Sequence, residues 1–91
     1  MGFNVGDFVR VVNKGYGYPL YKEWVEDNCP KYLGHWKEGK ELKNGDTGTI
    51  LHIAPHMSGR DILHLVRSGG SVYVMGETSI ELINSFTVEL I

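Results

Sequence analysis

Three of the four histidines in this chain could converge on a metal ion. His52 and His56 are four residues apart, and His64 falls on the next predicted strand. A four-residue spacing aligns two side chains on a helix, whereas His52 lies in a predicted strand and His56 in a loop after Pro55. No cysteine or carboxylate stands at the spacing that completes a zinc set. We therefore predict no metal site and no bound cofactor.

Cys29 is the only cysteine of the chain and its one candidate for a thiol nucleophile. It follows Glu26 and Asp27, and neighbouring carboxylates raise the pKa of a thiol, which disfavours the reactive thiolate. His35 could act as a base, but no spacing in the sequence places His35 beside Cys29. The sequence also lacks paired carboxylates and a glycine-rich phosphate-binding motif. We therefore predict that the protein is not an enzyme.

Aromatic residues concentrate between residues 15 and 43, which hold most of the tyrosines and both tryptophans. Tyrosine and tryptophan are enriched at binding hot spots because they bring a large contact area with few rotatable bonds. The alternative is that they pack this segment onto the rest of the protein. We predict that Tyr16 and Tyr18 are exposed in a glycine-rich loop and contact a partner. Exposed parts of Tyr32 or Trp36 complete this predicted binding surface.

Charged residues of both signs share the same segment. Lysines among aromatics could bind nucleic acid, with phosphates on the lysines and bases stacked on the rings. Carboxylates cancel much of that positive field, and the whole chain has a net charge of −2 and a pI near 6.0. We therefore expect a mixed, solvated face, with nucleic acid as a less favoured partner than protein. The lysines concerned are Lys14, Lys22, Lys31, Lys37, Lys40 and Lys43.

The rest of the sequence predicts a mainly β protein, and 91 residues predict a single domain, 1–91. Segments rich in β-branched residues and bounded by turn residues predict strands at 8–12, 46–53, 62–67 and 72–75. Short connections make the last three an antiparallel meander. Five or six strands are expected, with one face of each strand buried, although the second and third strands are apolar on both faces. The predicted inward set includes Val9, Val11, Ile50, Leu63, Leu65, Val72 and Val74.

Residues 15–43 are predicted to form a helical insertion between the first and second strands. Leu20, Trp24 and Val25 recur at helical spacing on one stripe, so we expect them to anchor a helix. Pro30 ends that helix, and a second short helical turn is expected after it. The insertion therefore combines buried anchors with the aromatic residues that are predicted to meet a partner.

The C-terminus contains two similar pentamers, Ser79–Ile83 and Thr87–Ile91. They could form a hairpin about Asn84 and Ser85, or a closing strand followed by an extra edge strand. We favour the second arrangement, preceded by a short helical turn near Glu77.

Two stretches, Val5–Val11 and Asn44–Ile50, share a Gly-Asp turn that leads into an alternating strand. With the order of strand, long loop, meander, short turn and final strand, this pattern resembles the Src-homology-3-like and KOW-type small β-barrels. The resemblance implies a small antiparallel barrel that carries the helical insertion between its first and second strands. The chain is also similar to small uncharacterised proteins encoded by bacteriophages and mobile elements, which often bind a host protein or a defence-system component.

Three hypotheses for function follow. The leading one is a non-catalytic protein-binding module, an adaptor or an inhibitor, which the second resemblance extends to a phage-encoded protein acting on a host or defence protein. The alternatives are a nucleic-acid-binding barrel and a binder of a small nucleotide-like ligand. Raising the salt concentration separates the first two, because phosphate-driven binding weakens steeply. The sequence has no signal-type start and no run of ~20 apolar residues, so we expect a cytoplasmic protein without a membrane partner.

Overall fold

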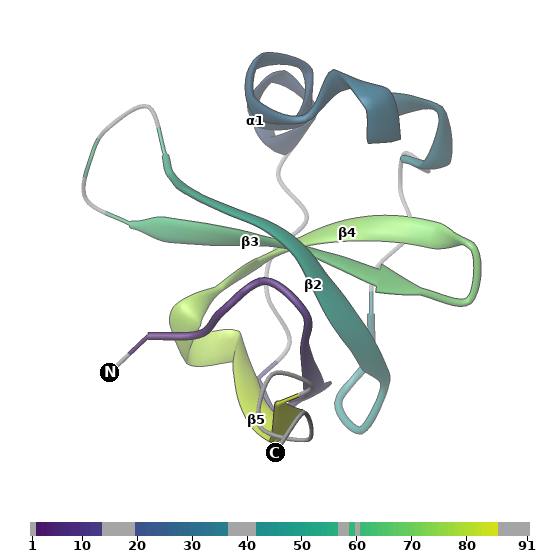
Figure 1. Ribbon diagram of the computed structural model, residues 1–91, viewed down its shortest axis with the longest axis vertical. Helices are drawn as coiled ribbons and strands as arrows, with labels where there is room; N and C mark the ends of the chain where they lie inside the picture. The colour runs from purple at the N-terminus through teal and green to yellow at the C-terminus, as the bar shows by residue number, and fades with distance from the viewer. Residues whose placement is uncertain (1, 14–19, 37–41, 57–58, 60, 86–91) are drawn as a thin grey trace.

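The computed structural model describes residues 2–13, 20–36, 42–56, 59 and 61–85. It confirms the predicted order of elements, in which a helical insertion separates the first strand from a meander of three strands (Figure 1). None of the helices in these residues is long and apolar enough to cross a membrane. The elements are β1 (Asp7–Val11), α1 (Leu20–Asn28), the 3-10 helix η1 (Pro30–His35), β2 (Thr47–Pro55), β3 (Ile62–Ser68), β4 (Ser71–Gly76), the 3-10 turn η2 (Glu77–Ser79) and β5 (Ile80–Ser85).

The strands form one antiparallel sheet in the order β4-β3-β2-β1-β5. The predicted class is confirmed, since the protein is mainly β with a helix between its first two strands. The predicted barrel is not closed, because β4 and β5 are the two edges of the described sheet and do not pair with each other. Closure would require these edges to meet, and the described residues instead make a curved, open sheet (Figure 1).

Residues 80–83 of the first C-terminal pentamer lie in β5, which pairs with β1 and is an edge of the described sheet, so it does not close a barrel. Asn84 and Ser85 lie within this strand opposite Phe8 and Asp7, so they do not form the alternative hairpin turn. The predicted helical turn before this strand is also confirmed as η2. The second pentamer, residues 87–91, lies outside the described residues.

The turns that lead into β1 and β2 have the same hydrogen bonds. The Asn4 N–H donates to Asp7 Oδ2 (2.8 Å), and the Asp7 N–H donates to the Asn4 carbonyl (3.1 Å). In the second turn the Lys43 N–H donates to Asp46 Oδ2 (2.8 Å), and the Asp46 N–H donates to the Lys43 carbonyl (3.0 Å). An aspartate that accepts a nearby backbone N–H fixes a turn. The repeated Gly-Asp pattern in the sequence therefore corresponds to one repeated local structure.

These two turns also bond reciprocally to the opposite strand. The Gly6 N–H donates to the Ile50 carbonyl, and the Gly45 N–H donates to the Val11 carbonyl, each at 2.8 Å. Gly6 and Gly45 have φ angles of 97° and 96°, a region that glycine enters without steric cost. One turn lies at each end of the β1–β2 pair, so together they fix its register.

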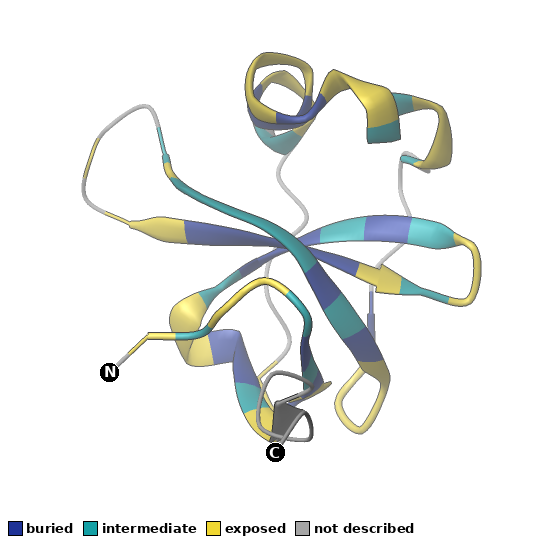
Figure 2. Ribbon diagram, in the orientation of Figure 1, coloured by how far each residue is buried: buried dark blue, intermediate teal, exposed yellow. Residues whose placement is uncertain are grey.

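The sheet is buried on both faces where β3 and β4 run through it, as Figure 2 shows. Successive side chains of a strand point to opposite faces, so β3 and β4 each supply residues to two clusters. The first cluster fills the concave side between β1, β2, β4 and β5, and the second joins the outer face to the insertion. The first contains Val9, Val11, Leu42, Ile50, Val66, Met75 and Ile80. The second contains Trp24, Val25, Cys29, Leu63, Leu65, Val72 and Val74.

All seven predicted core residues are buried, but the prediction that they share one inward face is wrong. The β3 and β4 members of that set pack against the insertion in the second cluster. Val66 and Met75 supply the inner face in their place. The error arises because β3 is apolar at positions of both parities, so alternation alone cannot assign its faces. In the structure, the insertion covers the outer face of β3 and β4, so apolar residues on that face are buried as well.

His64 is a titratable side chain in the interior, with 2% of its surface exposed. Its Nδ1 lies 3.1 Å from the Met75 carbonyl, which can only accept, so Nδ1 carries a proton and donates. The Phe3 ring meets the imidazole edge to face at 5.3 Å. Burial lowers the pKa of His64, while the Met75 carbonyl and the charge of Glu77 oppose that shift. The fold therefore favours the neutral imidazole.

Acidification should consequently destabilise the protein through His64. The folded-state pKa lies below the ordinary value, so the unfolded chain takes up the proton first, and stability falls as the pH drops below about 6.5. One such proton contributes a slope of at most about 1.4 kcal/mol per pH unit. Urea unfolding at pH 7.5, 6.0 and 5.0 should show a smaller slope for His64→Gln. The exposed His35→Gln variant is the control and should keep the wild-type slope. An unchanged slope in His64→Gln would contradict this assignment.

Candidate binding site

The structure describes two of the four residues predicted to bind a partner. Tyr32 lies in η1. Trp36 follows η1 directly, and its backbone forms an isolated parallel β-bridge with Val72 of the edge strand β4. Both side chains are half-buried against the second cluster, so each divides its surface between packing and solvent. Tyr16 and Tyr18 lie outside the described residues.

Helix α1 is anchored to the sheet by Trp24 and Val25, as predicted. Trp24 is 1% exposed and Val25 is fully buried. The indole N–H of Trp24 donates to the Pro55 carbonyl at the end of β2 (3.3 Å). The side-chain amide of Asn28 donates to the Trp24 carbonyl one helical turn earlier (2.9 Å). The side chain of Leu20, the third predicted anchor, lies outside the described part of the structure.

Strand β2 has a bulge at the point where it passes under the insertion. Ile50 pairs with Val66 and His52 with Leu65, which leaves Leu51 as the extra residue. Bulges re-aim side chains and are common beside binding sites. Here two successive side chains reach the insertion, because Leu51 packs in the second cluster and the His52 ring lies 5.9 Å from that of Trp24.

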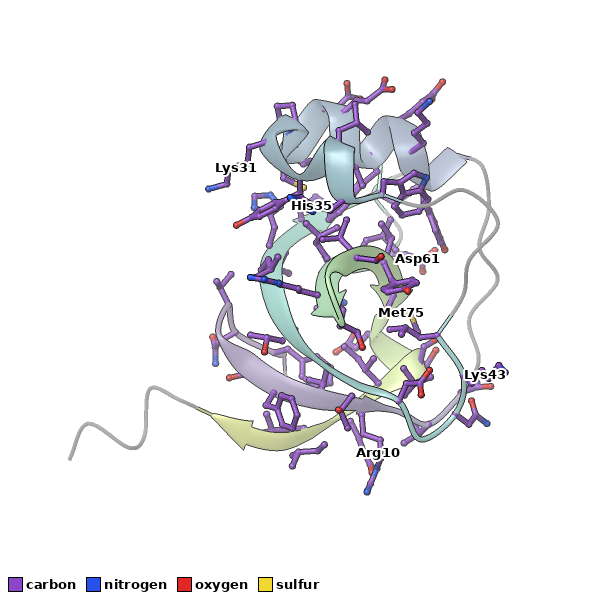
Figure 3. All side chains as sticks on the ribbon, turned by 90° about the vertical axis from the view of Figure 1, so that its right-hand side faces the viewer. Arg10, Lys31, His35, Lys43, Asp61 and Met75 are labelled. Carbon is purple, nitrogen blue, oxygen red and sulfur yellow. The ribbon has the colours of Figure 1, made fainter. Side chains whose placement is uncertain are left out.

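An open pocket of about 320 Å³ lies where the end of α1, the start of η1 and this bulge meet. Figure 3 places the insertion above the curved sheet, with Lys31 projecting from its outer edge. Tyr32 is the predicted site residue that the fold brings to this pocket. The pocket is lined from the insertion and from the sheet by Asn28, Cys29, Pro30, Lys31, Tyr32, Leu51 and His52.

The electrostatic character of the pocket comes from Lys31. Its ammonium group lies 5.1 Å from the centre of the Tyr32 ring, within the range of a cation–π contact. Burial raises the pKa of the Cys29 thiol, and the positive charge of Lys31 opposes that rise. The sequence correctly predicted a raised thiol pKa but assigned it to neighbouring carboxylates, whereas burial is the main cause. A thiol of raised pKa is protonated at neutral pH, so Cys29 acts as an apolar wall.

The three histidines considered for a metal site do not face one another. His52 contacts Trp24 on the outer face of the sheet, whereas His64 is buried on the inner face beside Phe3. His56 meets the ring of Tyr21 at 6.4 Å. Within the described ranges, no three His, Cys, Asp or Glu side chains lie close enough together to hold a metal ion.

Two of the described lysines of the insertion and its flanks do not share one surface. Lys31 and Lys43 lie on opposite sides of the molecule (Figure 3). A surface that tracks a nucleic-acid backbone needs several cations along one groove. Lys14, Lys37 and Lys40 lie outside the described residues.

The sequence did not identify Leu51, His52, Cys29 and Lys31 as parts of one site. The bulge that turns Leu51 and His52 toward the insertion leaves no signature in an apolar strand without glycine at that position. In the sequence, Pro30 predicts that the helix ends near Cys29, but nothing in these residues predicts that Cys29, Lys31 and Tyr32 lie over β2. Comparison of the chain with protein-family models, curated proteins and solved structures finds no match.

Proposed function

We propose that this protein is a non-catalytic binding module, an adaptor or an inhibitor, whose insertion contacts a protein partner. The observation that carries the proposal is the pocket between the insertion and the β2 bulge, with Tyr32 on its wall. Pockets that bind ligands are concave and mostly apolar, with a few polar groups that orient what enters. This pocket combines the two kinds of group in similar measure, since Cys29 and Leu51 are apolar while Lys31 and His52 are polar.

The packing around the site supports a preorganised surface. Trp24 and Val25 hold α1 on the sheet, and the bulge holds Leu51 and His52 in place beneath it. A binding surface on rigid elements loses little conformational entropy when a partner docks. Tyr32 is the type of residue that supplies hot-spot energy in such a surface.

Partner capture tests this proposal. Immobilised wild-type protein is incubated with cytosol of the native cell, and retained proteins are identified by mass spectrometry. Tyr32→Ala should weaken binding of the specific partner by about 1–3 kcal/mol, which is roughly 5- to 150-fold in Kd. The unfolding midpoint of the Tyr32→Ala protein should fall less than it would after the truncation of a fully buried side chain, because Tyr32 keeps part of its surface in solvent.

Leu82→Ala is the matched control, since Leu82 is a large apolar residue on β5 that is 53% exposed and does not line the pocket. The captured partner should bind this variant as it binds wild type. A partner that is lost with Leu82→Ala and retained with Tyr32→Ala would place the interface on β5 and overturn the proposed site. Retention that disappears at moderate salt and after nuclease treatment would support the nucleic-acid alternative instead.

A further inference from the structure

We propose that the pocket between the insertion and the β2 bulge receives an acidic side chain, glutamate or aspartate, from the partner protein. The inference rests on the proposed function and adds the chemistry of the group that enters the site. It follows from the charge of the pocket, from the nature of its walls and from its capacity for one anion.

The pocket has a cation but no carboxylate among its described lining residues. Lys31 contributes the one full positive charge, and its ammonium group lies 5.1 Å from the centre of the Tyr32 ring, which also lines the pocket. A carboxylate that enters this pocket would lie among residues that include Lys31, and an opposite charge nearby favours the ionised form of a carboxyl group.

The walls suit an acidic side chain that has a short apolar stem. Leu51 and Cys29 offer apolar surface to methylene groups. The imidazole of His52, held against the Trp24 ring, can donate an N–H to a carboxylate oxygen. One N–H of the Asn28 side-chain amide donates to the Trp24 carbonyl, which orients this side chain in the wall.

A single carboxylate fits this donor set better than a phosphate does. Phosphates in proteins are usually held by several cations, by arginine forks or by a helix N-terminus with free N–H groups. The described pocket has Lys31 alone as a full cation. At the start of η1, Pro30 has no N–H, and the Tyr32 N–H donates to the Cys29 carbonyl (3.0 Å). The charge of Lys31 balances that of one carboxylate, and the imidazole of His52 can add one N–H donor.

Chemical-shift titration of the ¹⁵N-labelled protein tests the inference. The probes are glutamate capped as N-acetyl and N-methylamide, and glutamine with the same caps, at low ionic strength. Capped glutamate should bind with a Kd on the order of 1–10 mM, which is usual for so small a probe. The shifts should centre on Lys31, Tyr32, Leu51 and His52. Capped glutamine should bind about three- to fivefold more weakly, as expected for loss of one exposed ion pair.

Lys31→Gln should bring glutamate binding down to the level of glutamine. Lys43→Gln removes the same charge on the opposite side of the molecule and should leave the titration unchanged (Figure 3). Equal binding of the two capped residues, or shifts centred away from the pocket, would overturn the inference. Free butyrate carries the same single carboxylate without the peptide caps. If butyrate binds markedly more tightly than capped glutamate, the pocket is assigned to a small carboxylate and a protein source of that group is overturned.

The two proposals fail separately. If the probes show no carboxylate preference while Tyr32→Ala still abolishes partner capture, the binding module stands and only the acidic side chain is wrong. If partner capture survives Tyr32→Ala, the proposed function fails whatever the titration shows.

Discussion

Replacing Trp24 by alanine should lower the free energy of unfolding by about 3–5 kcal/mol, the usual cost of deleting a large buried aromatic. Trp24 is 1% exposed, and its indole fills the space between α1 and the outer face of the sheet. The substitution also removes the hydrogen bond that the indole N–H donates to the Pro55 carbonyl. For a domain of this size, such a loss corresponds to a fall in the melting midpoint of well over about 10 °C.

Thermal and urea unfolding monitored by far-ultraviolet circular dichroism provide the measurement. Lys22→Ala is the matched control, because Lys22 is an exposed residue of the same helix and alanine is a good helix former. Its stability should stay within about 0.5 kcal/mol of wild type. A Trp24→Ala protein that unfolds at the wild-type midpoint would mean that α1 is not anchored to the sheet by this side chain.

Replacing Gly48 by alanine should be the most damaging single-methyl change in the sheet, with a cost of about 2–4 kcal/mol. Gly48 lies in β2 opposite Val9 of β1. An added Cβ would lie 2.5 Å from the Arg67 carbonyl oxygen and 2.6 Å from Val66 Cγ1. The carbonyl oxygen belongs to the backbone of β3, so it cannot move without disturbing the pairing of β2 with β3.

Gly34→Ala makes the same chemical change where there is room for it. Gly34 lies in η1 and is not among the glycines of positive φ. A methyl group added there would meet no other segment of the described chain within 4 Å. Alanine at this position should be neutral or stabilise the protein by up to about 1 kcal/mol, because it reduces the entropy of the unfolded chain. Equal unfolding midpoints for the two variants would show that β2 and β3 are farther apart at Gly48 than the structure has them.

These two substitutions distinguish the contribution of the insertion to stability from that of the strand pairing in the sheet. Trp24→Ala removes packing between α1 and the outer face, while Gly48→Ala strains the pairing of β2 with β3. Among the molecules that remain folded, Trp24→Ala should weaken partner binding more than Gly48→Ala. Trp24 contacts His52 of the pocket wall and positions the insertion, whereas Gly48 does not line the pocket.

The local elements of this protein were determined by the sequence alone. Trp24 and Val25 at helical spacing, followed by Pro30, predicted a helix that the structure has at Leu20–Asn28. The two Gly-Asp pairs predicted turns, and each aspartate accepts a hydrogen bond within its own turn. Such patterns are readable because the residues that define them are neighbours in the chain and act through local backbone geometry.

The tertiary structure alone decided which face of each strand is covered and by what. Leu65 and Val66 are adjacent and both fully buried, the first against the insertion and the second in the concave core. Their sequence cannot distinguish these roles, since both are apolar and the covering segments are distant in the chain. The bulge at Leu51 is likewise set by how β2 pairs with β3. The pocket depends both on the insertion covering the outer face and on the bulge, because it lies where the insertion crosses that bulge.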